Sequence, residues 1–198
     1  MMKQVQIKSR WTGAVLYTAD IPDDTPSGLE MRAALERATQ ARAYLAGAYL
    51  AGAYLAGANL AGAYLARAYL AGANLAGAYL ADANLAGAYL AGANLADANL
   101  AGAYLAGANL AGAKWTEEIV ITKTPIQISG LHWFVTILDA HMQIGCELHS
   151  LAEWAEFDDA RIVAMDGRDA LRFWRDHKEA LLSLAQSCGR SFDPVEAK

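Results

Sequence analysis

The sequence predicts a mainly β protein built on a solenoid whose turns stack, with a smaller folded segment at each end. Three observations support this fold class. From Ala43 onward the chain repeats a five-residue unit fourteen times without insertion, ending at Gly112. Leucine occupies the centre of every unit, and alanine stands two residues before it and one residue after it. The flanking segments lack the repeat and have the patterns of short strands followed by helices.

A period of five excludes an ordinary helix or strand. On an α-helix, at about 100° per residue, successive leucines rotate by about 140° and form no single stripe. In a flat strand, an odd period sends each leucine to the opposite face from the last. The pattern therefore predicts a coil that buries its leucines. These predicted core residues are Leu45, Leu50, Leu55, Leu60, Leu65, Leu70, Leu75, Leu80, Leu85, Leu90, Leu95, Leu100, Leu105 and Leu110.

A membrane helix is also disfavoured, although residues 43–66 carry no charge. Glycine and Tyr or Asn recur every fifth residue, so a spanning helix would turn amides toward lipid on several sides. The first residues contain no apolar core of signal-peptide length, and we expect a cytoplasmic protein. The two cysteines, Cys146 and Cys188, fit a reducing compartment and are expected to be free thiols.

The net charge of −5 is distributed unevenly. Residues 1–42 carry six basic and five acidic side chains, and residues 114–198 carry nine basic and fourteen acidic ones. The repeat between them has only Arg67, Asp82 and Asp97. Because no basic patch is available to neutralise phosphates, we expect no direct binding to nucleic acid.

The repeated unit resembles that of the pentapeptide-repeat family, whose units follow an A(D/N)LXX pattern. The resemblance covers about a third of the chain. It implies a right-handed four-sided β-helix with four units per turn, so that the fourteen units make about 3.5 turns. It also implies that the central leucine and the alanine two residues before it point inward. Some members of the family mimic DNA and inhibit gyrase and other type II topoisomerases, using acid-rich sides.

We expect three parts: a β-hairpin and helix cap at 1–42, the solenoid at 43–113 and an α+β domain at 114–198. In the first part, two short strands within residues 3–19 precede a helix from about Leu29 to Ala41. Ser27 and Glu30 have the spacing of a capping box for this helix. The arginines of this helix are expected to be solvated charges; they are Arg32, Arg37 and Arg42.

In the third part, strands are predicted within 118–128 and 131–146, where β-branched and aromatic residues are enriched. Ser150 and Glu153 form a second capping-box pattern. A longer helix is predicted to follow Asp166 or Gly167 and to end at Gly189. Its expected core-facing stripe consists of Leu171, Trp174, Leu181, Leu184 and Cys188.

The residue before each leucine is Tyr in eight units and Asn in six. Counting in twenties places most of the tyrosines on two adjacent sides of the coil. These candidate interaction residues are Tyr49, Tyr69 and Tyr89 on one side, and Tyr44, Tyr64 and Tyr104 on the next. Tyrosine is enriched at protein interfaces, which favours a docking or dimerisation face. The alternative is a structural role, in which the stacked rings shield the Ala and Gly backbone.

One cluster has a chemical character. Cys146 and His149 have a C-x-x-H spacing that could share a zinc ion with His141, but the paired elements of strong zinc sites are absent. The alternatives are a thiol nucleophile assisted by His149, or a buried thiol beside partly exposed histidines. We expect no cofactor and no bound metal.

The segments IGCELHSLAEW, MDGRDAL and FWRDHKEALL resemble the C-terminal region of pentapeptide-repeat proteins encoded by phages and prophages. This resemblance covers residues 125–190 and implies a protein of a bacterial host cell. Our leading hypothesis is a non-enzymatic protein that presents its solenoid to a host or phage protein, with a homodimer as a further expectation. The alternatives are a DNA-mimic inhibitor of gyrase or another DNA-acting protein, and a metal or thiol enzyme within 114–198.

Overall fold

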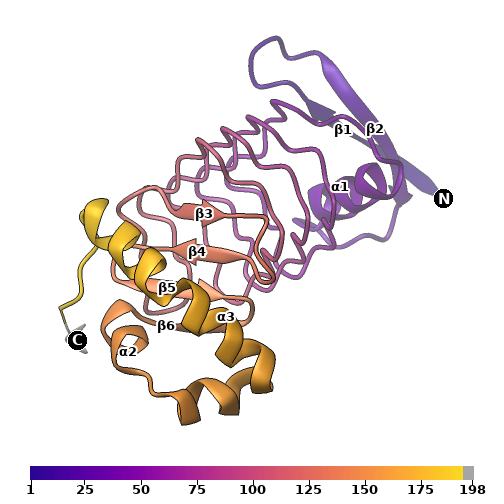
Figure 1. The fold of residues 1–198 in the computed structure, drawn as a ribbon. Helices are drawn as coiled ribbons and strands as arrows, with labels where there is room; N and C mark the ends of the chain where they lie inside the picture. Colours follow the sequence, from indigo (N-terminus) through magenta and orange to yellow (C-terminus); the bar gives the residue numbers. More distant parts are fainter. Residues whose placement is uncertain (194–198) are drawn as a thin grey trace. The chain divides into compact units, whose positions relative to one another are not determined.

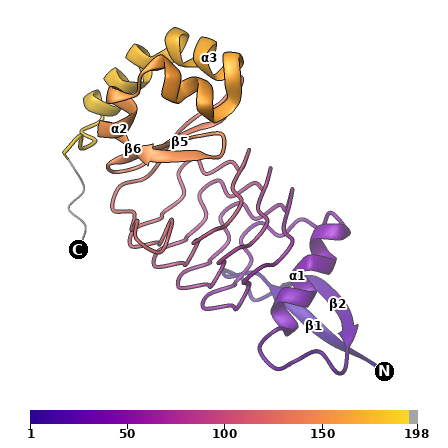
Figure 2. The same ribbon diagram turned by 90° about the horizontal axis from the view of Figure 1, so that it is seen from below.

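The chain forms two compact units in a computed structural model that describes residues 1–193. The first unit spans Met1–Thr124, and the second begins at Pro125. Figures 1 and 2 show the repeat of the first unit as a coil of stacked turns, and Figure 1 shows the strands and helices of the second unit.

Each turn of the coil has twenty residues. Parallel β-bridges join every residue that precedes a leucine to its counterpart twenty positions later, from Tyr44 with Tyr64 through to Asn94 with Lys114. The backbone amide of Leu45 donates to the carbonyl of Tyr64 at 3.0 Å, and successive units repeat this bond. Four five-residue units therefore complete one turn.

A tight turn ends each unit, so the coil contains single bridges in place of long strands. The N–H of Ala48 donates to the carbonyl of Leu45 at 3.0 Å across such a turn. Gly47, at the third position of the turn, has a φ of 71°. Glycine adopts this left-handed conformation at the least cost, which explains why it recurs every fifth residue.

The leucines fill the interior of the coil. Thirteen of the fourteen are buried, including Leu75 at 1% exposure. Leu100 differs from the expectation because it is only half-buried. Alanines such as Ala73 and Ala78 are also fully buried, since the leucine layers leave room only for small neighbours.

The first turn of the coil is covered by the N-terminal elements. These are β1 (Met2–Lys8), β2 (Val15–Pro22) and α1 (Glu30–Gln40). The hairpin continues the ladder, because the N–H of Tyr49 donates to the carbonyl of Lys8 and the N–H of Arg10 donates to that of Gly47, both at 2.8 Å. The first turn thus has partners for backbone groups that an open edge would leave unpaired.

Helix α1 closes another part of the same edge with side chains. The Arg32 guanidinium donates to the carbonyls of Ala56 at 2.7 Å and Gly57 at 3.0 Å. Glu36 accepts from the backbone N–H of Asn59 at 3.0 Å and pairs with Arg32 at 3.2 Å. The expectation that Arg32 is merely solvated was wrong: it holds the cap on the coil.

The capping box predicted for α1 is also absent. The helix begins at Glu30 after an N-cap at Leu29, and no side chain caps it. The Glu30 carboxylate accepts from the N–H of Gly28 at 2.6 Å. Ser27 lies outside the N-cap position, so its hydroxyl takes no part.

The far end of the coil is paired by the chain that leaves it. Lys114 forms an antiparallel bridge with Val120, and the N–H of Ile121 donates to the carbonyl of Ala113 at 2.8 Å. These contacts carry the first unit to Thr124, whereas the sequence placed the division after residue 113.

The second unit is an antiparallel sheet in the order β3-β4-β5-β6 with helices α2 and α3. The elements are β3 (Ile126–Ile128), β4 (Val135–Ile137), β5 (His141–Ile144), β6 (Glu147–Ser150), α2 (Leu151–Glu156) and α3 (Asp159–Ser187). The predicted strand over 118–128 forms only at its last three residues, because the preceding segment pairs with the coil. The predicted strand region 131–146 divides into β4 and β5, and β6 was not foreseen.

The capping box of Ser150 and Glu153 at α2 is confirmed, with both reciprocal bonds present. Helix α3 contains a break at Asp166 and Gly167, where Gly167 has φ 67° and ψ −149°. This region of φ and ψ is open essentially to glycine alone. The break explains why the sequence suggested a helix start at this point.

The core of the second unit joins the sheet to the helices. Buried sheet residues such as Val135 and Met142 pack in one cluster with Trp174 and Leu181 of α3. Cys188 departs from the predicted stripe and is exposed, because it is the C-cap, beyond which helical spacing no longer applies. Among residues 1–193, no helix combines the length and apolar character needed to cross a membrane.

Truncation of a central leucine should destabilise the coil. Leu75→Ala is expected to cost about 2 to 5 kcal/mol, through lost burial and the cavity left behind. Chemical unfolding followed by circular dichroism measures this. Leu100→Ala, at a half-buried position, is the matched control and should cost no more than about 1.5 kcal/mol. Equal losses for the two variants would contradict a core made of leucine layers.

Replacing the arginine that ends a unit should stabilise the coil. Arg67 has a φ of 57°, a conformation that strains any side chain with a Cβ. Arg67→Gly should raise the free energy of unfolding by about 0.5 to 1 kcal/mol, after allowance for the extra freedom of glycine in the unfolded chain. The opposite change at an equivalent position, Gly72→Ala, should lower the free energy of unfolding by about 1 kcal/mol. No described atom beyond its chain neighbours would lie within 4 Å of the added Cβ, so the loss would report backbone strain alone.

Candidate binding surfaces

The six tyrosines predicted as an interaction surface lie on two adjacent sides of the coil. Their exposed fractions are Tyr44 72%, Tyr49 54%, Tyr64 46%, Tyr89 41% and Tyr104 58%, while Tyr69 is only half-buried. On one side, the ring centroids of Tyr49 and Tyr69 are 5.7 Å apart, and those of Tyr69 and Tyr89 are 5.6 Å apart. On the next side, the Tyr44 and Tyr64 rings are 6.5 Å apart. The rings thus form a ladder of three on one side and a ladder of two on the next, where Asn84 separates Tyr64 from Tyr104.

One of these ladders already binds a guanidinium from the same chain. The Cζ atom of Arg10 lies 4.6 Å from the ring centroid of Tyr69 and 5.6 Å from that of Tyr89. Beside it, Trp11 packs so closely on Gly47 that a Cβ there would lie 2.0 Å from the indole. The N-terminal hairpin therefore covers part of this side, and the side of Tyr44, Tyr64 and Tyr104 is more open.

The asparagines at the equivalent positions have an internal role. The Oδ1 atom of Asn84 accepts from the N–H of Ala86 at 3.1 Å, and Asn74 makes the same bond to Ala76. A tyrosine at this position cannot close such a short turn with its side chain. Each tyrosine therefore replaces a bond within the coil with an aromatic ring directed to the outside.

The three residues of the C-terminal His and Cys cluster are not brought together. His149 lies opposite the buried Met142 and so shares the core face of the sheet, whereas His141 lies opposite Ser150 on the other face. Cys146 is in the turn between β5 and β6 and is exposed, so the expectation of a buried thiol was wrong. Within residues 1–193, no group of three His, Cys, Asp or Glu side chains could hold a metal ion.

His149 is engaged with a carboxylate and with aromatic rings. Its Nε2 lies 3.0 Å from the Oε2 of Glu147, and its ring contacts Trp154 and Phe157 edge-on, with centroids 5.3 Å and 5.0 Å away. No hydrogen bond joins His149 to the Cys146 thiol in the described part of the chain. The pair that a thiol nucleophile would need is therefore not assembled.

His141 is half-buried and has a shifted pKa. Burial lowers its pKa from the ordinary value of 6.5, and the Glu153 carboxylate partly offsets that effect. The pKa of Glu153 is lowered in turn, chiefly by the backbone N–H of Ser150 and then by its hydroxyl.

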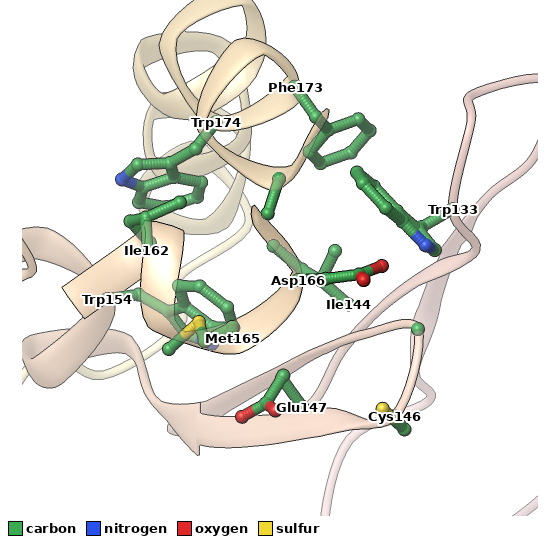
Figure 3. Close-up of a pocket in the computed structure, with 12 residues that line it drawn as sticks. Trp133, Ile144, Cys146, Glu147, Trp154, Ile162, Met165, Asp166, Phe173 and Trp174 are labelled. Atoms are coloured by element: carbon green, nitrogen blue, oxygen red, sulfur yellow. The ribbon is translucent and has the colours of Figure 1, made fainter. Parts of the chain in front are cut away.

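A cavity of about 230 Å³ in the second unit was not foreseen from the sequence. Figure 3 shows it beneath the break in α3, with Trp133 and Phe173 on one flank and Trp154 and Trp174 on the other. Sequence reasoning placed Trp174 in a core stripe and missed the cavity, because its walls come from four separate segments. The high share of tryptophan in this half of the chain was the one available signal.

Comparison with known proteins identifies the coil and leaves the second unit unassigned. The family model for pentapeptide repeats, in eight copies, matches residues 43–80 and 78–114. No protein of curated function matches the chain.

Several solved structures resemble the chain over its repeat. HetL of the cyanobacterium Nostoc, a pentapeptide repeat protein involved in the regulation of heterocyst differentiation, is 44% identical over 36% of each chain, with a TM-score of 0.24. A thylakoid-lumen pentapeptide repeat protein of Arabidopsis thaliana is 36% identical over 35% of this chain and 51% of its own, with a TM-score of 0.24. A second Nostoc pentapeptide repeat protein is 39% identical over 41% of this chain and 76% of its own, with a TM-score of 0.22. The chain thus spans about a third of HetL and about half of the Arabidopsis protein.

Acid should destabilise the second unit through His141. Because its folded-state pKa is lowered, the unfolded chain takes up a proton there that the folded chain does not. This loss of stability begins as the pH falls through about 6.5 and grows until the lower folded-state pKa is reached. Urea unfolding followed by tryptophan fluorescence at about pH 7.5 and about pH 5.5 measures it.

The variant His141→Gln should lose less stability on acidification than the unmodified chain. The control is His132→Gln, which changes an exposed imidazole of the same unit. If the variant and the unmodified chain lose the same stability on acidification, the burial of His141 does not cause that loss.

Proposed function

We propose that this chain, which belongs to the pentapeptide-repeat family through residues 43–114, is a non-enzymatic protein that binds another protein through the tyrosine sides of its coil. One observation carries the proposal: five of the six tyrosines on two adjacent sides are more than 40% exposed on a backbone that is hydrogen-bonded turn by turn. Such rings offer a large contact area at a low entropic cost, because the coil already fixes their spacing.

The contact of Arg10 with Tyr69 supports a specific chemistry for the partner. A guanidinium 4.6 Å from a tyrosine ring gains a cation–π interaction as well as apolar contact. The neighbouring ladder of Tyr44 and Tyr64 has the same kind of spacing and lies outside the contact made by Arg10. We infer that the partner places an arginine-bearing segment on this open ladder.

The setting proposed for this interaction is the cytoplasm of a bacterial host cell, with a protein of the host or of a phage as partner. It rests on the resemblance of residues 125–190 to phage and prophage proteins. A homodimer is a further form of the same proposal, since a flat tyrosine side could pair with its own copy.

The DNA-mimic alternative finds little support in the charges of the coil. Imitation of phosphate rows requires a dense negative potential. Asp82 and Asp97 end units that fall on different sides of a twenty-residue turn, and Arg67 adds a positive charge. The enzyme alternative lacks an assembled nucleophile pair or metal cluster within residues 1–193.

Removing the three tyrosines of the open side should weaken partner binding strongly. The variant Tyr44→Ser, Tyr64→Ser and Tyr104→Ser is expected to recover its specific protein from bacterial lysate at least about tenfold less efficiently than the unmodified chain. The matched control, Tyr54→Ser with Tyr79→Ser, alters tyrosines of similar exposure, 50% and 57%, on the other two sides. Circular dichroism verifies that both variants fold.

Two outcomes would count against the assignment. If both variants recover the same proteins as the unmodified chain, the tyrosines have a structural role. If binding is lost equally in the control, the contact is not specific to this side. Light scattering at several protein concentrations tests the dimer. A molar mass equal to that of one chain at every concentration would rule the dimer out.

A further inference from the structure

The second unit contains a cavity that the proposed function does not use. It lies beneath the break in α3, and its rim includes the turn between β5 and β6. We propose that this cavity binds a small organic cation with an alkylated ammonium head.

Four aromatic side chains line the cavity. Trp133 and Phe173 contact each other with centroids 5.2 Å apart and rings 81° apart, so they stand as two perpendicular walls of one corner. Trp154 and Trp174 form a second pair with centroids 5.0 Å apart. The faces of such rings carry the negative part of the quadrupole, and tryptophan is the strongest of them at holding a cation.

Two carboxylates give the cavity a negative rim. Asp166 and Glu147 both line it, and Figure 3 shows the Asp166 carboxylate directed toward Trp133. Asp166 is exposed and forms no ion pair within residues 1–193, while Glu147 contacts His149. The unit as a whole is acidic, with eleven acidic and six basic residues in 125–193. Apolar walls beside a negative rim complement a ligand that has both apolar surface and a positive charge.

Within residues 1–193, no Lys or Arg side chain lines the cavity. The Lys178 ammonium lies 5.5 Å from the Trp174 ring centroid, but it donates to the carbonyl of Ala155 at 2.7 Å and does not line the cavity. Arg168, close to Asp166 in sequence, is exposed and is also absent from the lining. The Lys178 contact is a cation–π interaction between an ammonium group and Trp174, a residue that also lines the cavity.

Two glycines make the cavity possible. A Cβ at Gly145 would lie 3.1 Å from Cδ1 of Trp133, so this glycine lets the indole pack on the turn. Gly167 permits the break in α3, and Asp166 precedes it with φ −149° instead of a helical value. At about 230 Å³, the space is smaller than the roughly 300 Å³ at which pockets for drug-sized ligands begin. The occupant is therefore a compact group such as a trimethylammonium head.

Calorimetric titration of the full chain with choline tests the proposal. The comparison ligand is 3,3-dimethyl-1-butanol, which has the same shape without the charge. Choline is expected to bind saturably and at least about tenfold more tightly than the neutral alcohol. No saturable binding of choline, or equal affinity for the two ligands, would overturn the proposal. Sodium chloride at matched ionic strength controls for general salt effects.

Substitutions then locate the site. Asp166→Asn should weaken choline binding about threefold to thirtyfold and leave the affinity for the neutral alcohol unchanged. Asp169→Asn removes an equal charge from an exposed residue of the same helix that does not line the cavity, and should change neither affinity. Trp133→Leu, which keeps an apolar side chain, should weaken choline by a similar factor. Equal effects of the two aspartate variants would mean that choline binds elsewhere.

A third ligand identifies the source of the ammonium group. A short peptide with one trimethyl-lysine presents the same head on a protein side chain. Tighter binding of the peptide than of choline would assign the site to a modified protein, and tighter binding of choline would assign it to a free metabolite. Both results presuppose the saturable binding of choline tested above and support recognition of an organic cation.

Discussion

The coil of the first unit depends on the hydrogen-bonded ladder that joins each five-residue unit to the unit one turn later. This ladder exists only because each unit turns the chain by one side, which requires a left-handed residue at every fifth position. Glycine meets that requirement in eleven units, and Arg67, Asp82 and Asp97 meet it under strain. Leucine burial then follows from the ladder, since the four units of each coil turn direct their central side chains toward one another.

A ladder of this kind has two open ends, and the flanking sequences exist largely to close them. Arg32 and Glu36 bind carbonyl and amide groups of the first turn that would otherwise lack a neighbour. At the other end, the segment around Ile121 pairs with Ala113, so backbone hydrogen bonds close this end of the coil. Closure protects the protein from edge-to-edge association while leaving its sides available for binding.

The two units offer different kinds of recognition chemistry. The coil presents rings on a regular, nearly uncharged surface, a geometry suited to an extended contact with another macromolecule. The second unit encloses its rings around a small cavity beside Asp166, a geometry suited to a compact ligand. In both places an aromatic ring lies near a cationic side chain of the same chain, Arg10 on Tyr69 and Lys178 on Trp174.

The five-residue period of the sequence predicted a stacked coil with a leucine core, and the resemblance to the pentapeptide-repeat family supplied the twenty-residue turn that assigns each tyrosine to a side. A strict repeat places every contact between turns of the coil at one constant spacing, so a single number, the residues per turn, specifies them all. The second unit has no such property. Its sheet, the separation of His141 from His149 and the cavity walls depend on segments that meet only in the folded state. Trp133 and Trp174 are far apart in the chain, and no local pattern specifies that both would line one cavity.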